Sequence, residues 1–127
     1  MNNNFKSFEE LECWKACREV RIYIANIVKK YPYNEKFSLV DNMLRSARSI
    51  TNNIAEGYGR FHYKENIQFC RVSRGSLYEL RDQIICSFDE GFIENGEYRK
   101  SLELITKATA LLNGYINYLK KRLTMNE

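Results

Sequence analysis

Residues 95–123 read NGEYRKSLELITKATALLNGYINYLKKRL and carry the most regular hydrophobic pattern in the chain. The positions that form this pattern recur three or four residues apart: Tyr98, Leu102, Ile105, Thr109, Leu112, Ile116, Leu119 and Leu123. Such spacing places them all on one side of an α-helix. We therefore expect a helix over residues 96–123, with Asn95 as its N-cap and one buried face.

Three segments before this helix show the same spacing, over residues of about 8–31, 39–58 and 63–90. Pro32 is expected to stop the first segment, because proline cannot continue a helix. Ser38 precedes the second segment and is a favourable N-cap residue. The sequence therefore predicts four amphipathic helices.

Glycines give further expectations about these helices. Gly57 or Gly59 should end the second helix and Gly91 the third, because glycine readily adopts the left-handed conformation that closes a helix. Gly75 lies inside the third helix, where glycine costs about 1 kcal/mol relative to alanine. The usual structural gain from such a glycine is that a neighbouring helix can approach closely, so we expect a close approach there.

The predicted fold class is all-α, an up-down-up-down antiparallel four-helix bundle. The connections between the four segments are short, which makes successive helices antiparallel neighbours. No segment alternates between polar and apolar residues with period two, so strands are not expected. With 127 residues, the chain is long enough for one compact domain, and we expect a single domain over residues 1–127.

Composition narrows the class of protein. The chain is 44% hydrophobic and 28% charged, as is typical of a folded protein, and its net charge of +4 is mildly basic. No apolar run approaches the roughly 20 residues that cross a bilayer. The N-terminus, MNNNFK, lacks the apolar core of a secretory signal. We therefore expect a cytoplasmic protein with reduced cysteines and no membrane partner.

Catalytic and metal-binding patterns are weak, so we expect neither an enzyme, nor a cofactor, nor a bound metal. His62 is the one histidine, which is too few for a di-iron bundle site. Cys13 and Cys17 lie four residues apart but within an apolar stripe, where buried structural thiols are more common than ligands. Glu56 as an acid or base is kept as a remote alternative.

Residues 45–60 are unusually polar for a helix that also buries an apolar face. We expect Asn53 and Glu56 to form hydrogen bonds with Arg45, or with Arg74 or Ser76 on the facing helix, since a buried carboxylate needs a partner. The alternative is a pocket or a notch that binds a partner. The expected structural polar network consists of Arg45, Asn53, Glu56, Arg60, Arg74, Ser76 and Glu79.

Several motifs resemble a known family. They are Leu11 with Trp14, Tyr31-Pro32, Phe37-x-Leu39, the run LRSARSITNNIAEGYGR at residues 44–60, and GSLYEL at residues 75–80. Residues 8 to about 123 resemble the four-helix bundle proteins encoded within intervening sequences of bacterial 23S ribosomal RNA genes. The departures are Asn42, where glutamine is common, and Cys17, where alanine is usual.

The resemblance implies a ring-like homopentamer without an active site. The family is also similar in fold to accessory proteins of diversity-generating retroelements. Those pentamers bind nucleic acid and a reverse transcriptase through basic surfaces, so the resemblance makes exposed arginines and lysines the candidate contacts.

Two functional hypotheses follow. The first is association with ribosomal RNA or another nucleic acid, through basic residues that are interleaved with tyrosines; the same residues also fit an ordinary solvated face. The candidate contacts are Lys15, Arg18, Arg21, Lys29, Lys30, Lys107, Lys120, Lys121 and Arg122. The second is an oligomeric scaffold that docks a partner protein, because nine tyrosines, seven phenylalanines and one tryptophan are more than one bundle core easily encloses.

Overall fold

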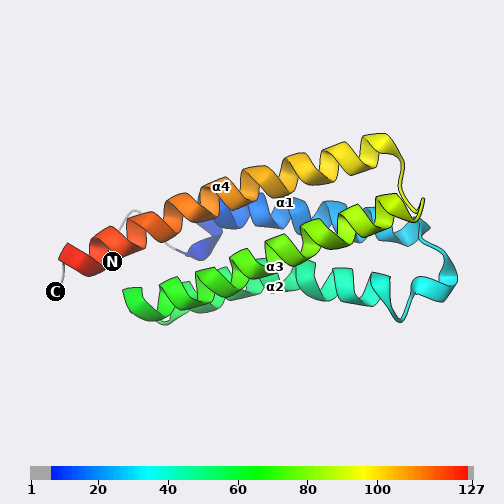
Figure 1. Cartoon of the computed structure of the whole chain (residues 1–127). Coiled ribbons are helices and arrows are strands. Elements are labelled where there is room, and N and C mark those ends of the chain that lie inside the picture. The colour runs from blue at the N-terminus through cyan, green and yellow to red at the C-terminus, as the bar shows by residue number, and fades with distance from the viewer. Residues whose placement is uncertain (1–6, 126–127) are drawn as a thin grey trace.

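The computed structural model describes residues 7–125, and all regular secondary structure within that range is helical. The main helices are α1 (Glu12–Ile27), α2 (Leu39–Gly59), α3 (Tyr63–Asp89) and α4 (Asn95–Met125). Each packs against two neighbours in the circular order α1, α2, α3, α4, and all four lie along one long axis (Figure 1). The all-α four-helix bundle is therefore confirmed.

Every helix contributes to the core through residues three or four positions apart. Among the fully buried side chains are Val20, Ile24, Met43, Ile50, Ile54, Leu77, Leu80, Ile84, Ile105, Leu112 and Ile116. Burial of each such side chain contributes about 1.5–3 kcal/mol. On α4 the buried position is Ala108 rather than the predicted Thr109, which is half-buried and donates from Oγ1 to the carbonyl of Ile105 at 2.7 Å.

The first predicted helix is divided in the structure. A 3₁₀ turn at Phe8–Glu10 precedes Leu11, whose extended backbone (φ −70°, ψ 128°) separates it from α1. After Ile27 the chain tightens into a second 3₁₀ turn, Val28–Lys30. A third, Tyr33–Glu35, lies in the connection to α2. Proline disfavours helical backbone in the residue before it, so the helical path ends ahead of Pro32 as predicted.

The N-terminus of α4 differs from the prediction. Asn95 is the first helical residue, and the amide of Tyr98 donates to the carbonyl of Glu94 at 2.9 Å. Glu97 Oε1 accepts a hydrogen bond from the amide of Glu94 at 3.1 Å, which is the returning half of a capping box. Glu94 therefore occupies the cap position that was predicted for Asn95.

The glycine expectations are confirmed in part. The helix α2 ends at Gly59, one of the two expected positions, but the left-handed residue after that end is Phe61 (φ 58°) rather than a glycine, and Gly57 is buried inside the helix. Gly91 does adopt the left-handed conformation (φ 78°). A Cβ on Gly57 would lie 2.7 Å from Asn66 Oδ1, whereas one on Gly75 would meet no atom within 4 Å. The close approach between helices is thus at Gly57, not Gly75.

Two connections lie at one end of the bundle, α1 to α2 and α3 to α4, and the start of α3 lies with the end of α4 at the other end (Figure 1). None of the helices within residues 7–125 is long and apolar enough to span a membrane.

Candidate nucleic-acid interface

The three candidate cations on α1 differ in their surroundings. Lys15 Nζ forms an ion pair with Glu12 Oε2 of the same helix at 3.1 Å. Arg21 Nη1 reaches α2 and donates a hydrogen bond to Thr51 Oγ1 at 2.7 Å. Arg18 is exposed, and its side chain has no partner within residues 7–125. Two of the three head groups are thus already bound within the protein.

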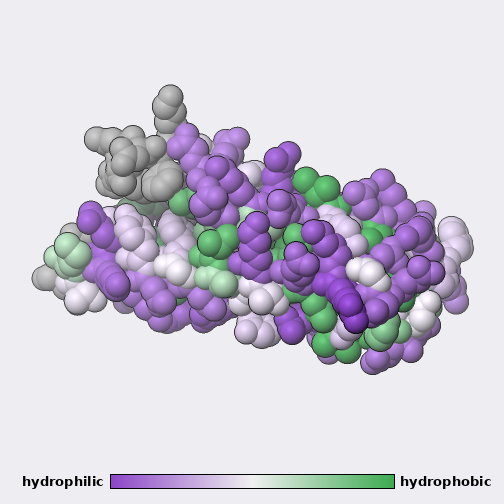
Figure 2. Space-filling model, turned by 90° about the horizontal axis from the view of Figure 1, so that it is seen from above, coloured by the Kyte–Doolittle hydropathy of each residue, from purple (hydrophilic) through white to green (hydrophobic). Residues whose placement is uncertain are grey.

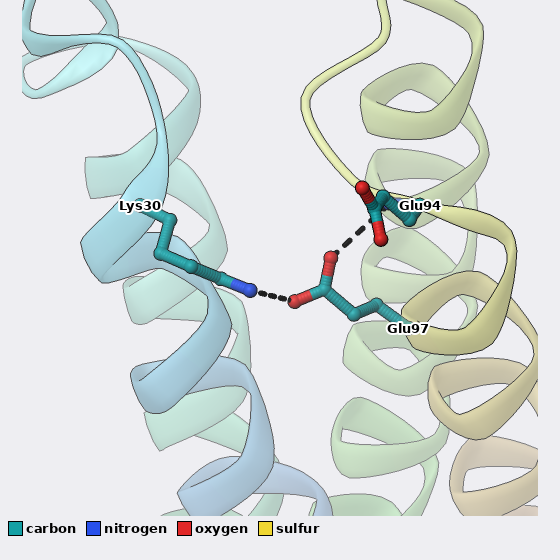
Figure 3. Close-up of polar contacts among 3 residues, drawn as sticks. All are labelled: Lys30, Glu94 and Glu97. Carbon is teal, nitrogen blue, oxygen red and sulfur yellow. Dashed lines mark hydrogen bonds and ion pairs between the residues drawn. The ribbon is translucent and has the colours of Figure 1, made fainter.

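Lys29 and Lys30 lie in the 3₁₀ turn that follows α1, next to the start of α4. Figure 3 shows Lys30 in an ion pair with Glu97, the residue that also accepts the amide hydrogen of Glu94. Their hydrogen bond raises the pKa of Lys30 and lowers the pKa of Glu97. Lys29 Nζ donates to Asn26 Oδ1 at 3.5 Å. The positive charge of Lys30 is therefore neutralised locally.

The four candidate cations on α4 lie in two places. Lys107 Nζ is 3.9 Å from Glu19 Oε2 on α1. Lys120 and Lys121 are exposed in the last turns of α4, and Arg122 Nε donates to the hydroxyl of Tyr63 on α3 at 3.4 Å. Between Glu97 and Lys121 the helix rises roughly 35 Å, at 1.5 Å per residue. The nine candidates therefore do not form one patch.

The predicted polar network is partly assembled between α2 and α3. Asn53 Nδ2 donates to the carbonyl and the hydroxyl of Ser49, each at 2.9 Å. The hydroxyls of Ser49 and Ser76 are 2.8 Å apart, so Asn53 is linked to the facing helix through Ser49. Nearby, Ser46 Oγ donates to Glu79 Oε1 at 2.6 Å. These short side chains form a polar seam along the contact between the two helices.

The other predicted members of the network have other partners, although Arg45 lines a pocket of about 430 Å³ together with Ser76 and Glu79. Glu56 is 46% exposed and pairs with Arg60 of its own helix at 3.2 Å, so it is not a buried carboxylate held by the facing helix. Arg60 also lies over the ring of Phe69, 5.1 Å from its centroid. Arg45 pairs with Asp41 at 3.1 Å and is 76% exposed. Arg74 turns the other way and donates to Asn113 on α4 at 2.9 Å.

The thiols and the histidine give no metal site within residues 7–125, where no group of three or more histidine, cysteine or acidic residues is arranged to hold an ion. Burial raises the pKa of Cys17 and of Cys70 to about 12 and that of Cys13 further. Such thiols remain protonated, which is unfavourable both for metal binding and for nucleophilic attack. His62 is exposed in the turn before α3.

Sequence reasoning missed Arg81 and Tyr78, which lie with Arg74 on the side of α3 that faces α4. Arg81 Nη1 donates to Thr106 Oγ1 on α4 at 3.2 Å, as Arg74 does to Asn113. Tyr78 lies between these two arginines and is 59% exposed. A signal was available in the sequence, because residues 66–78 and residues 104–126 contain no aspartate or glutamate.

Among the comparisons with known proteins, a family model identifies the family and a solved structure shows the same fold. A family model described as 23S rRNA-intervening sequence protein matches residues 9–114. A solved structure with a TM-score of 0.76 is a protein of unknown function from the S23 ribosomal protein family of Bacteroides thetaiotaomicron VPI-5482. It is 21% identical to this chain, and the match covers 83% of this chain and 95% of that one, a likeness that shows the fold. No curated protein matches the chain.

Proposed function

Because the chain belongs to the 23S rRNA-intervening sequence protein family, we propose that it is a non-enzymatic, cytoplasmic protein that binds ribosomal RNA. The observation that carries this proposal is the distribution of charge on α4. Residues 104–126 contain four basic residues and no acidic one, and Lys120 and Lys121 are exposed beside Tyr118. Exposed cations next to an exposed aromatic ring suit contact with phosphates and bases.

The surroundings of α4 are compatible with such contacts. The face of the molecule on the α4 side is mostly hydrophilic, and its exposed hydrophobic groups form separate patches (Figure 2). The absence of catalysis is supported by the raised pKa values of the buried thiols and by the solvent-exposed position of Glu56, which is paired with Arg60. Glu56→Gln is expected to leave the function intact and to alter stability slightly.

Titration of a structured fragment of 23S ribosomal RNA at 50 and 200 mM salt tests the proposal. We expect affinity to fall steeply with salt, and Lys120→Gln/Lys121→Gln to reduce the slope of log K against log salt by about 0.7–0.9 for each phosphate that these lysines neutralise. Lys15→Gln/Lys30→Gln is the matched control, because both lysines lie outside this stretch and are already paired with glutamates. Failure of the wild-type protein to bind at 50 mM salt would reject the proposal.

We also propose that the chain works as a homo-oligomer, with five subunits as the family resemblance implies. Large apolar side chains at the surface support assembly, since Tyr33 is 79% and Phe37 is 81% exposed. A groove of about 770 Å³ between α1 and α2 is lined by Trp14, Ile22 and Leu44 among others. Exposed apolar surface of this kind is typical of protein contacts. Docking of a partner protein such as a reverse transcriptase is the alternative use of the same surface.

Light scattering at micromolar concentration tests the assembly directly. The expected mass is about five times that of one chain, and Phe37→Ser should lower it if the connection between α1 and α2 takes part in subunit contacts. A monomer at that concentration would reject the proposal, and an oligomer with another subunit number would correct its stoichiometry.

A further inference from the structure

The contact between α3 and α4 brings together two stretches without acidic residues, 66–78 on α3 and 104–126 on α4. The intervening segment, residues 79–103, is acidic, with seven aspartates and glutamates against three arginines and lysines. The antiparallel packing nevertheless places the two stretches side by side, as the bond from Arg74 to Asn113 shows. The result is a face with arginines and lysines but no acid from either stretch.

A groove of about 480 Å³ runs along this face between the two helices. Its walls include Leu77 and Tyr78 from α3, and Ile105 and Asn113 from α4. The floor is therefore partly apolar, while the rim is polar and basic. A groove with this composition fits a ligand that has flat apolar groups and negative charges.

Two arginines at the groove retain free donors: Arg81 lines it, and Arg74 is bound to Asn113, which lines it from α4. Arg74 and Arg81 each donate one Nη1 hydrogen bond to a neutral side chain of α4, at 2.9 and 3.2 Å. Within residues 7–125 neither arginine forms an ion pair, in contrast to Lys15, Lys30 and Lys107. A guanidinium has five N–H donors, so each arginine keeps most of them available for an anionic ligand.

Tyr78 lies four residues after Arg74 and three before Arg81, so these side chains are neighbours on the helix surface. An exposed aromatic ring stacks on unpaired bases, and guanidinium groups on either side of it contact phosphates. Bases inside a duplex are stacked on each other and cannot reach such a ring. The groove therefore favours an unpaired strand over a double helix.

The two ends of the groove differ in charge, because acidic residues lie near one end only. Asp82, four residues after Tyr78 on α3, and Glu103 on α4 lie on the side of the groove towards the α3–α4 connection. In the opposite direction, towards the end of α4, the charged residues that follow the groove are Arg71 and Lys120, both exposed. A polyanionic strand is thus favoured along the part of the face from Arg81 to Lys120.

We propose that the groove between α3 and α4 binds an unpaired RNA strand, with Tyr78 stacked on a base and Arg74 and Arg81 bound to the adjacent phosphates. This inference rests on the proposed function and names the part of the molecule that performs it. It also assigns Arg74 to RNA contact rather than to the polar network expected from the sequence.

A fluorescent 12-nucleotide oligouridine and a fully paired RNA duplex of the same length are the probes. We expect the wild-type protein to bind the single strand more tightly than the duplex. Tyr78→Ala should weaken oligouridine binding by roughly 5- to 150-fold, the range expected when one base-stacking interaction is removed, and Tyr78→Phe should retain it. Arg74→Gln/Arg81→Gln should reduce the salt slope by about 0.7 for each phosphate that these arginines bind.

Arg45→Gln/Arg48→Gln on α2 is the matched control, because both arginines are exposed but border the groove between α1 and α2. Thermal unfolding and light scattering of each variant accompany the titrations.

If wild-type protein binds RNA and Tyr78→Ala binds it equally well, the RNA site in the groove is overturned while the proposed function stands. If wild-type protein binds neither probe nor the ribosomal fragment at low salt, both are overturned. If Tyr78→Ala changes the mass but not the affinity, the groove is a subunit contact and the proposal is wrong.

Discussion

The two sides of α3 pack against their neighbours in opposite ways. Towards α2, small side chains let the helices close on each other: a Cβ on Gly57 would lie 2.9 Å from Phe69 Cβ, and Ser73 Oγ donates to the carbonyl of Ile50 at 2.6 Å. Towards α4, Arg74 and Arg81 each reach a side chain of the neighbouring helix, and a groove of about 480 Å³ lined by Arg81 lies between the helices. Small polar residues thus close one contact and stabilise the fold, while long basic residues leave the other open to a ligand.

The largest expected effect comes from the pair Gly57→Ala and Gly75→Ala. Both replace a helical glycine, so both gain the same intrinsic helix propensity, and their difference measures the space available. We expect Gly57→Ala to lower the free energy of unfolding by about 1–3 kcal/mol, because its methyl group overlaps Asn66 and Phe69. Gly75→Ala should raise it by about 0.5–1 kcal/mol, because nothing lies within 4 Å. Urea denaturation of both variants checks this, and equal shifts would contradict the close α2–α3 contact.

Removal of a buried hydroxyl from the same side of α3 should have the next largest effect. Ser73 is fully buried, and Ser73→Ala removes its hydrogen bond to the carbonyl of Ile50, at an expected cost of about 1 kcal/mol. Ser76→Ala is the control, because Ser76 is half-buried and shares its hydrogen bond with Ser49. Denaturation midpoints should fall more for Ser73→Ala, and the reverse order would show that depth of burial does not determine strength here.

Replacement of an arginine on the side of α3 that faces α4 should change the free energy of unfolding little. Arg81→Ala removes one hydrogen bond between exposed groups, so we expect a change within about 0.5 kcal/mol in the free energy of unfolding. Its affinity for oligouridine should fall clearly in the same preparation. A large drop in stability with unchanged RNA affinity would make Arg81 a structural link between helices and would remove the contrast between the two sides of α3.

The smallest expected effect on stability comes from the ion pair between Lys30 and Glu97, which lies outside both contacts of α3. The hydrogen bond from Lys30 lowers the pKa of Glu97 from its ordinary value of 4.5, so its contribution to stability is present at pH 7 and is lost as pH falls through 4.5 and then through the lowered value. We expect wild-type protein to lose slightly more stability than Glu97→Gln between pH 7 and pH 3.5, measured by urea denaturation at both pH values. Identical losses would show that exposure to solvent screens the pair completely.

The helices were predictable because their signal is local. Apolar residues at intervals of three and four fix which side of each segment is buried, and α2, α3 and α4 lie within two residues of the predicted ranges, whereas α1 is shorter than predicted. The details that were missed depend on single contacts. Leu11 breaks the first segment, and the capping box between Glu94 and Glu97 shifts the cap from the predicted Asn95.

The candidate site was less predictable because pairing depends on residues far away in the sequence. The link between Asn53 and Ser76 was expected, although Ser49 as its intermediate was not. Glu56 was expected to contact the facing helix. It forms an ion pair with Arg60 instead, which lies one turn along the same helix. Which cations are neutralised also depends on the packing, as the pair between Lys30 and Glu97 illustrates.

The sequence alone determined four amphipathic helices, their antiparallel order and the two stretches without acidic residues, since each of these is a property of neighbouring positions in the chain. The tertiary structure decided which glycine lies at a helix contact and which arginines keep free donors. It also decided that the two acid-free stretches share one groove. The physical reason is that helix periodicity repeats every 3.6 residues, whereas steric overlap and ion pairing depend on which atoms from distant segments are brought within a few ångströms.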